Sequence, residues 1–259
     1  MLYQKLINDF VDLTIEILGS QLTGIYLHGS LAMGCFNPEK SDIDLIVVIE
    51  HEITDVQKMQ FMEQIVALNR QAPAKGLEIS IVLRKYCAPF IYPTPFELHF
   101  SPVHLQWFYN NPQNYVENMK GMDKDLAAHF TIIRRYGVTL FGEEIEKVFA
   151  DVPARNYIDS IWEDVKNAGK EIVDQPVYIV LNLCRVLAFL QDGLCLSKRE
   201  GGKWAMEHLP VEDTAIISSA LKCYRTSQDM TREEESGRAF SDKMLTKIEV
   251  LMEHHVDKV

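Results

Sequence analysis

The sequence predicts an α+β fold, with an N-terminal domain built on a mixed sheet with flanking helices and a C-terminal α-helical bundle. Strand-like runs rich in Ile, Val and Leu dominate before about residue 100, and helical periodicity dominates after residue 155. A chain of 259 residues that is 47% hydrophobic is long enough for two modest cores. We therefore expect domains over residues 1–150 and 151–259, with a boundary near Pro153.

Two aspartates stand at the start of a strongly apolar run. Asp42 and Asp44 lead into residues 45–49 (Leu-Ile-Val-Val-Ile), and residues two apart on a strand point to the same face. Two unpaired carboxylates there would repel each other, so they need a cation or a raised pKa on one of them. An isolated Asp-x-Asp is usually a solvated turn, but this context favours Mg²⁺, which prefers oxygen ligands. We predict that Asp42 and Asp44 bind Mg²⁺.

A Gly-Ser pair precedes the aspartates. Residues 24–28 (Gly-Ile-Tyr-Leu-His) are predicted to form a strand, and Gly29-Ser30 is placed to turn tightly into residues 31–33. Backbone N–H groups at a helix start, with the Ser30 hydroxyl beside them, form a phosphate cradle, and Gly29 allows close approach. With Ser41 next to Asp42, the stretch is predicted to bind a nucleotide and magnesium.

This order of Gly-Ser, spacer and Asp-x-Asp resembles the nucleotidyltransferases of the polymerase beta superfamily, whose pattern includes a third acid on a neighbouring strand. Glu78, in the strand-like stretch 76–83, supplies that acid. The resemblance implies that Glu78 is a general base, a metal ligand or both; the alternative is a solvent-facing residue on an edge strand. A helix over 54–70 joins the two strands, with a capping box at Thr54-x-x-Gln57. Its apolar residues, placed largely on one face, are Val56, Met59, Met62, Ile65, Val66 and Leu68.

The second half of the chain narrows the resemblance. Residues 125–142, 181–193 and 196–205 are similar to the aminoglycoside adenylyltransferases of the streptomycin and spectinomycin resistance type, and the similarity extends from about residue 24 to 224. It implies that ATP and drug bind in a cleft between the two domains. It also implies that AMP passes from ATP to a drug hydroxyl, with Mg²⁺ as cofactor.

By position, the resemblance assigns roles to three residues of the second half. Arg185 and Lys198 match residues on the triphosphate, and Tyr224 matches an aromatic residue near the nucleotide. Each has an alternative that does not involve a ligand. Arg185 would form an internal salt bridge with Asp192 or Glu200, Lys198 would be solvated, and Tyr224 would belong to the core.

Two positions depart from the streptomycin-modifying members of this family. Those members have a tryptophan where this chain has Val103, and an aspartate where it has Gln175. Trp107 and Asp174 lie close by, and a small alignment shift would restore either residue. Without the shift, streptomycin loses a packing surface and a cation partner, so spectinomycin is the favoured substrate.

Charge and composition limit the kinds of partner that this chain is expected to bind. A net charge of −11 argues against nucleic acid, which calls for a basic surface. It suits a cationic aminoglycoside or aminocyclitol, although acidity also serves solubility. Five irregularly spaced cysteines favour reduced thiols, and residues 1–19 and 177–190 resemble neither a signal peptide nor a membrane span. We expect a cytoplasmic monomer that binds no membrane.

Other functions remain open at this point. The chain would also fit a nucleotidyltransferase acting on another small molecule or on a protein hydroxyl, or a nucleotide-binding protein without catalysis. The histidines His28, His99 and His104 have no metal-ligand spacing. We expect strand histidines such as His99 to be neutral and hydrogen-bonded.

Overall fold

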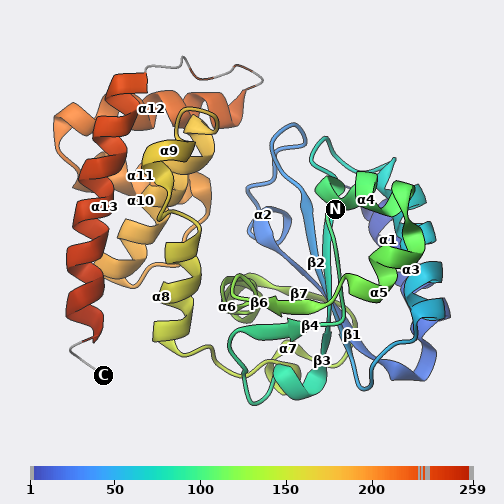
Figure 1. Cartoon of the computed structure of the whole chain (residues 1–259). Coiled ribbons are helices and arrows are strands. Elements are labelled where there is room, and N and C mark those ends of the chain that lie inside the picture. The colour runs from blue at the N-terminus through green and yellow to red at the C-terminus, as the bar shows by residue number, and fades with distance from the viewer. Residues whose placement is uncertain (1–2, 227, 229, 231–233, 257–259) are drawn as a thin grey trace. The chain divides into compact units, whose positions relative to one another are not determined.

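The computed structural model describes residues 3–226, 228, 230 and 234–256, with side chains described up to residue 253. Its contacts divide the chain into two compact units, Met1–Val152 and Pro153–Val259, called unit 1 and unit 2 below (Figure 1). Unit 1 combines a mixed sheet with helices, and the elements described in unit 2 are helices, so the predicted α+β class is confirmed.

A five-stranded mixed sheet in the order β5-β3-β2-β1-β7 organises unit 1. β2 runs parallel to β3, and the other neighbouring strands are antiparallel. β4 and β6 form a separate two-stranded sheet. The strands are β1 Leu22–His28, β2 Ile43–Ile49, β3 Leu77–Leu83, β4 Thr94–Phe96, β5 Leu98–Phe100, β6 Gly121–Asp123 and β7 Val138–Gly142.

Helices cover both faces of this sheet (Figure 1). Buried residues of α1, α3, α4 and α5 pack on one face, and α6 and α7 pack on the other. The helices of unit 1 are α1 Gln4–Leu18, α2 Gly29–Ala32, α3 Asp55–Asn69, α4 Leu105–Asn110, α5 Pro112–Asn118, α6 Leu126–Tyr136 and α7 Ile145–Val148. Short 3₁₀ turns lie at Gly19–Gln21, Arg84–Tyr86 and Pro102–His104.

The β2–α3–β3 crossover sets two strands side by side. The predicted capping box is present, because Thr54 and Gln57 exchange hydrogen bonds at the start of α3. The prediction of the inner face is wrong for one residue: Val56 is 67% exposed, while Phe61 is fully buried. Val56 precedes Ile65 by nine residues, about half a turn out of phase on an α-helix, so the two cannot share a face.

Unit 2 packs its helices around α10, whose interior face carries many fully buried residues. Its helices are α8 Ala154–Glu163, α9 Ala168–Glu171, α10 Pro176–Asp192, α11 Lys198–His208, α12 Val211–Arg225 and α13 Glu234–Val256. None of the helices in the described part of the chain is long and apolar enough to cross a membrane.

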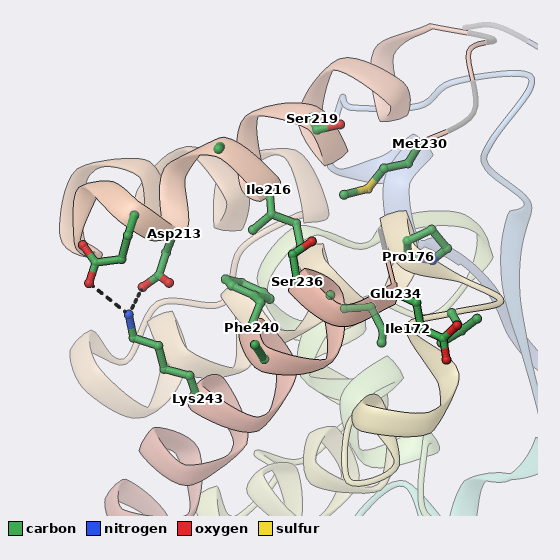
Figure 2. A pocket seen from close by; sticks show the side chains of 15 residues that line it. Ile172, Pro176, Asp213, Ile216, Ser219, Met230, Glu234, Ser236, Phe240 and Lys243 are labelled. Carbon is green, nitrogen blue, oxygen red and sulfur yellow. Dashed lines mark hydrogen bonds and ion pairs between the residues drawn. The ribbon is translucent and has the colours of Figure 1, made fainter. Parts of the chain in front are cut away.

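A cavity of about 520 Å³ lies within unit 2, lined by parts of α12, the first half of α13 and the segment leading into α10 (Figure 2). Ile216 and Phe240 contribute apolar walls. Lys243 contacts Asp213 at 2.7 Å and Glu212 at 3.3 Å, so its ammonium group is paired with carboxylates of α12.

Candidate active site

Three carboxylates meet at one end of the unit 1 sheet. Asp44 lies in β2 directly beside Glu78 in the parallel strand β3, and Asp42 immediately precedes β2. One oxygen from each of Asp42, Asp44 and Glu78 lies within 4.8 Å of the others, and all three side chains are partly buried. We call these residues the acid trio. Since β3 lies between β2 and β5, the alternative of an edge strand for Glu78 is wrong.

Gly29 forms the turn beside the acid trio. It follows β1, whose last residue, His28, lies opposite Asp44. Its φ is +62°, and an added Cβ would lie 1.8 Å from Asp44 Oδ2. A side chain at this position would therefore clash with the carboxylate and strain the backbone. The backbone of this turn is thus held against the Asp44 carboxylate.

The two serines of the predicted nucleotide site have different surroundings. Ser30 Oγ is buried without a hydrogen-bond partner, as a hydroxyl prepared for a ligand oxygen would be. Ser41 is also buried, but its Oγ accepts a hydrogen bond from the Asn37 N–H at 3.2 Å. Ser41 thus closes the loop that leads into Asp42.

These observations fit a hard divalent cation with bound phosphate. Three clustered carboxylate oxygens match the ligand preference of Mg²⁺, and each acid would otherwise face like charge at short range. The buried Ser30 hydroxyl, which has no hydrogen-bond partner, fits a phosphate group beside it.

The environment of Glu78 favours its protonated form. Burial raises the pKa of Glu78, the carboxylates of Asp42, Asp125 and Asp123 raise it further, and His129 acts in the opposite direction. A carboxyl group with a raised pKa is suited to accept a proton near neutral pH. The geometry thus allows Glu78 both metal contact and proton transfer.

A histidine that the sequence analysis missed lies next to the acid trio. His129, on α6, contacts Asp125 at 3.2 Å and lies with its ring centroid 4.7 Å from that of His28. Burial lowers the pKa of His129, but Asp125, Glu78 and Asp44 outweigh it and raise that pKa to about 10. The only sequence signal was the Asp125–His129 spacing of one helical turn.

Burial favours the neutral form of two other histidines of unit 1, His28 and His99. Burial holds the pKa of His28 well below its ordinary value, and His129 acts in the same direction. Burial lowers the pKa of His99 to about 4, with His104 and His129 contributing, and its Nδ1 hydrogen-bonds to Ser80 Oγ at 2.9 Å. The expectation of a neutral, hydrogen-bonded His99 is confirmed.

Arg185 is held by neutral groups of unit 2. Its Nε donates to the Leu196 carbonyl at 2.8 Å and its Nη1 donates to Asn182 Oδ1 at 3.0 Å. The alternative of a salt bridge to Asp192 or Glu200 is not found among the described residues. Those acids instead accept hydrogen bonds from Trp204 and from Ser197. Within the described part of the chain, the Arg185 guanidinium therefore forms no ion pair with an acid.

Lys198 and Tyr224 have distinct surroundings in unit 2. Lys198 is the first residue of α11, after a capping box formed by Ser197 and Glu200. Its Nζ lies 4.5 Å from the centroid of the Tyr178 ring. Tyr224, in α12, is 8% exposed, as a core residue would be. The structure thus brings Arg185 and Lys198 close to the same helix start, since Leu196 lies two residues before Lys198.

Two family models match this chain. The model described as a nucleotidyltransferase domain matches residues 11–95, which include the acid trio. The model described as the C-terminal domain of aminoglycoside adenylyltransferase matches residues 147–247.

Curated relatives cover most of the chain. A spectinomycin 9-adenylyltransferase of Staphylococcus aureus is 24% identical over 218 residues, 83% of this chain and 82% of the relative. An aminoglycoside (3'') (9) adenylyltransferase of Klebsiella pneumoniae is 25% identical over 214 residues, 80% of each chain.

A solved structure shares the fold. A spectinomycin adenyltransferase of Enterococcus faecalis, crystallised with ATP and spectinomycin, superposes with a TM-score of 0.82. The match has 19% sequence identity and covers 95% of this chain and 98% of the other. With both halves of the chain matched and the acid trio assembled, the chain belongs to the aminoglycoside adenylyltransferase family of nucleotidyltransferase enzymes.

Proposed function

We propose that this enzyme transfers AMP from Mg-ATP to a hydroxyl of an aminocyclitol or aminoglycoside antibiotic, with spectinomycin favoured over streptomycin, and so confers resistance. The observation that carries the proposal is the acid trio, whose oxygens lie within 4.8 Å of one another beside the Gly29 turn. The relatives named for spectinomycin and aminoglycoside adenylylation support the reaction and the drug class.

In the proposed reaction, the drug hydroxyl oxygen forms a bond to the α-phosphorus of ATP as the bond to the pyrophosphate oxygen breaks. Glu78 takes the hydroxyl proton, and pyrophosphate leaves with the electron pair of the broken bond. The raised pKa of Glu78 supports this role, because a base works best with a pKa close to the operating pH.

Asp42, Asp44 and Glu78 are the residues proposed to hold Mg²⁺. The bound ion would neutralise phosphate charge and stabilise the negative charge that develops on the leaving pyrophosphate. The turn at Gly29 and the Ser30 hydroxyl are proposed to receive a phosphate group, and Ser41 to support this loop. We propose that the enzyme acts as a monomer.

Residues of unit 2 are proposed to bind the nucleotide. Arg185 and Lys198 would contact the triphosphate, and Tyr224 would lie near the nucleotide. The charge of Arg185, which no described acid neutralises, supports a phosphate contact. None of the five cysteines forms a disulfide, which supports a reducing, cytoplasmic setting in which ATP is available.

The surroundings of Val103 and Trp107 support the preference for spectinomycin. Val103 is 81% exposed on its 3₁₀ turn, and a valine has no aromatic ring against which streptomycin could pack. The Trp107 ring packs edge-on against Tyr115 at 5.0 Å, and its N–H donates to Asn114 at 2.9 Å. Since Trp107 is already engaged, it is poorly placed to replace the missing tryptophan.

Mass spectrometry of the drug after incubation with Mg-ATP tests the proposal. We expect spectinomycin to gain one adenylyl group and streptomycin to remain largely unmodified. A susceptible bacterium expressing the chain should then survive spectinomycin at higher doses than one expressing Glu78→Gln. Unmodified spectinomycin under conditions where ATP binds would refute the proposed substrate.

A further inference from the structure

Lys198 occupies a position that does not favour a cation. It is the first residue of α11, an eleven-residue helix, and Arg199 follows it. The N-terminal end of a helix carries partial positive charge, so a cation in the first turn is disfavoured. The capping box at Ser197 and Glu200 satisfies backbone N–H groups there, and Glu200 offsets part of this charge.

The ring of Tyr178 gives the ammonium group a defined place. Lys198 Nζ lies 4.5 Å from the ring centroid, within the range of a cation–π contact. The Tyr178 hydroxyl donates to Asp164 Oδ2 at 3.3 Å, just after the end of α8. Asp164, Tyr178 and Lys198 therefore form a chain of contacts that links α8, α10 and α11.

The same face of α10 also carries Arg185. Tyr178 and Arg185 are seven residues apart, which is about two helical turns, so both side chains leave the helix on nearly the same side. Arg185 Nε donates to the carbonyl of Leu196, two residues before Lys198. An added Cβ at Gly201 of α11 would lie 2.7 Å from Arg185 Cγ, so this close contact needs a glycine. One face of α10 thus positions both cations at the start of α11.

We propose that Tyr178 is a positioning residue that holds the Lys198 ammonium group beside Arg185 for the triphosphate of ATP. This inference rests on the proposed function, in which both cations bind the triphosphate. A lysine side chain held in one conformation loses less entropy when it binds a phosphate. The aromatic ring contributes to this effect, and the Tyr178 hydroxyl fixes the ring through Asp164.

A double-mutant cycle on the full chain tests the role. Calorimetry would measure Mg-ATP binding without acceptor for wild type, Tyr178→Leu, Lys198→Met and the double variant. We expect Tyr178→Leu to weaken ATP binding about two- to fivefold, the scale of one cation–π contact. In the Lys198→Met background the same change should have no further effect. Tyr178→Phe keeps the ring and should bind ATP within about twofold of wild type.

Steady-state kinetics distinguish a positioning role of Tyr178 from damage to the fold. With spectinomycin as acceptor, Tyr178→Leu should raise KM for ATP and leave kcat nearly unchanged. Lys203→Met, on the same helix but exposed, is the matched control and should leave both constants unchanged.

Three results would overturn the inference, and they differ from one another. If Lys198→Met binds ATP like wild type, the triphosphate role of Lys198 is wrong, and the positioning role with it. If Lys198→Met weakens binding but Tyr178→Leu has the same effect in both backgrounds, Tyr178 has only a structural role. If Tyr178→Leu tightens binding, the ring competes with the triphosphate for the ammonium group.

Discussion

Units 1 and 2 position their candidate site residues by different means. In unit 1, strand register sets the acids, since Asp44 is paired with Glu78 across a parallel ladder. In unit 2, side-chain contacts set the cations, with Arg185 held by a carbonyl and Lys198 by an aromatic ring. The paired backbones of two strands can move less than a lysine side chain can. Changes in unit 1 should therefore stop the reaction, whereas changes in unit 2 should weaken nucleotide binding by degrees.

The largest effect is expected on removing charge from the acid trio. The double variant Asp42→Asn/Asp44→Asn should lower kcat by at least ~1,000-fold, because several kcal/mol of charge stabilisation depends on the metal. Calorimetric titration with Mg²⁺ in the presence of ATP should also show weaker metal binding. Undiminished Mg²⁺ affinity in this variant would show that the aspartates are not the ligands.

Gly29→Ala tests how closely the Gly29 turn packs against the Asp44 carboxylate. The new Cβ would lie 1.8 Å from Asp44 Oδ2 at a φ of +62°, so we expect a loss of activity of ~100-fold or more and a free energy of unfolding lower by ~1–3 kcal/mol. Gly34→Ala is the matched control, since Gly34 has a φ of +69° with open space around it. Gly34→Ala should therefore show only the effect of backbone strain. Equal activity of the two variants would remove the proposed role of the Gly29 turn.

Glu78→Gln separates binding from chemistry within unit 1. The amide keeps the shape of the side chain but cannot accept the hydroxyl proton, so kcat should fall by at least ~100-fold. ATP and drug binding, measured by calorimetry, should remain largely intact. Near-normal turnover would rule out the role of general base.

Arg185→Met is the corresponding test in unit 2. The loss of a charged hydrogen bond to phosphate should raise KM for ATP by ~10-fold, with a smaller change in kcat. Steady-state kinetics at saturating spectinomycin would measure both constants. A fall in kcat as large as that of Glu78→Gln would contradict the division between the two units.

The last prediction concerns the stability of unit 1 and its dependence on pH, not its activity. The pKa of His99 is about 4 in the folded chain, below its ordinary value of 6.5, so the unfolded chain takes up a proton first as the pH falls. The stability that comes from neutral His99 is therefore present above pH 6.5 and is lost toward pH 4. In urea unfolding, the free energy of unfolding of His99→Gln should fall less steeply with decreasing pH than that of wild type, by up to ~1.4 kcal/mol per pH unit over this window. Identical slopes would show that His99 does not titrate this way.

The acid trio was predictable because its signals are local. Asp42 and Asp44 precede an apolar run, and the capped helix that follows leads to the strand of Glu78. His129 was not predictable, because its approach to His28 depends on how α6 packs on the sheet. In the same way, no pattern in the sequence places the Tyr178 ring against Lys198.

The wrong expectations also have physical reasons. Val56 is apolar but lies in the first turn of α3, out of phase with the buried face. The alternative of a salt bridge from Arg185 to Asp192 or Glu200 is not found among the described residues, where these acids accept hydrogen bonds from Trp204 and Ser197. Composition alone cannot show which acid is already engaged as a hydrogen-bond acceptor.

The most direct test of the account is pyrophosphate release from Mg-ATP by the full-length protein with spectinomycin, with streptomycin and with no acceptor. The account predicts release that requires spectinomycin and is lost in Asp42→Asn/Asp44→Asn. Release with streptomycin at a comparable rate would contradict the interpretation of Val103 and Gln175. No release with either drug, despite ATP binding, would contradict antibiotic adenylylation itself.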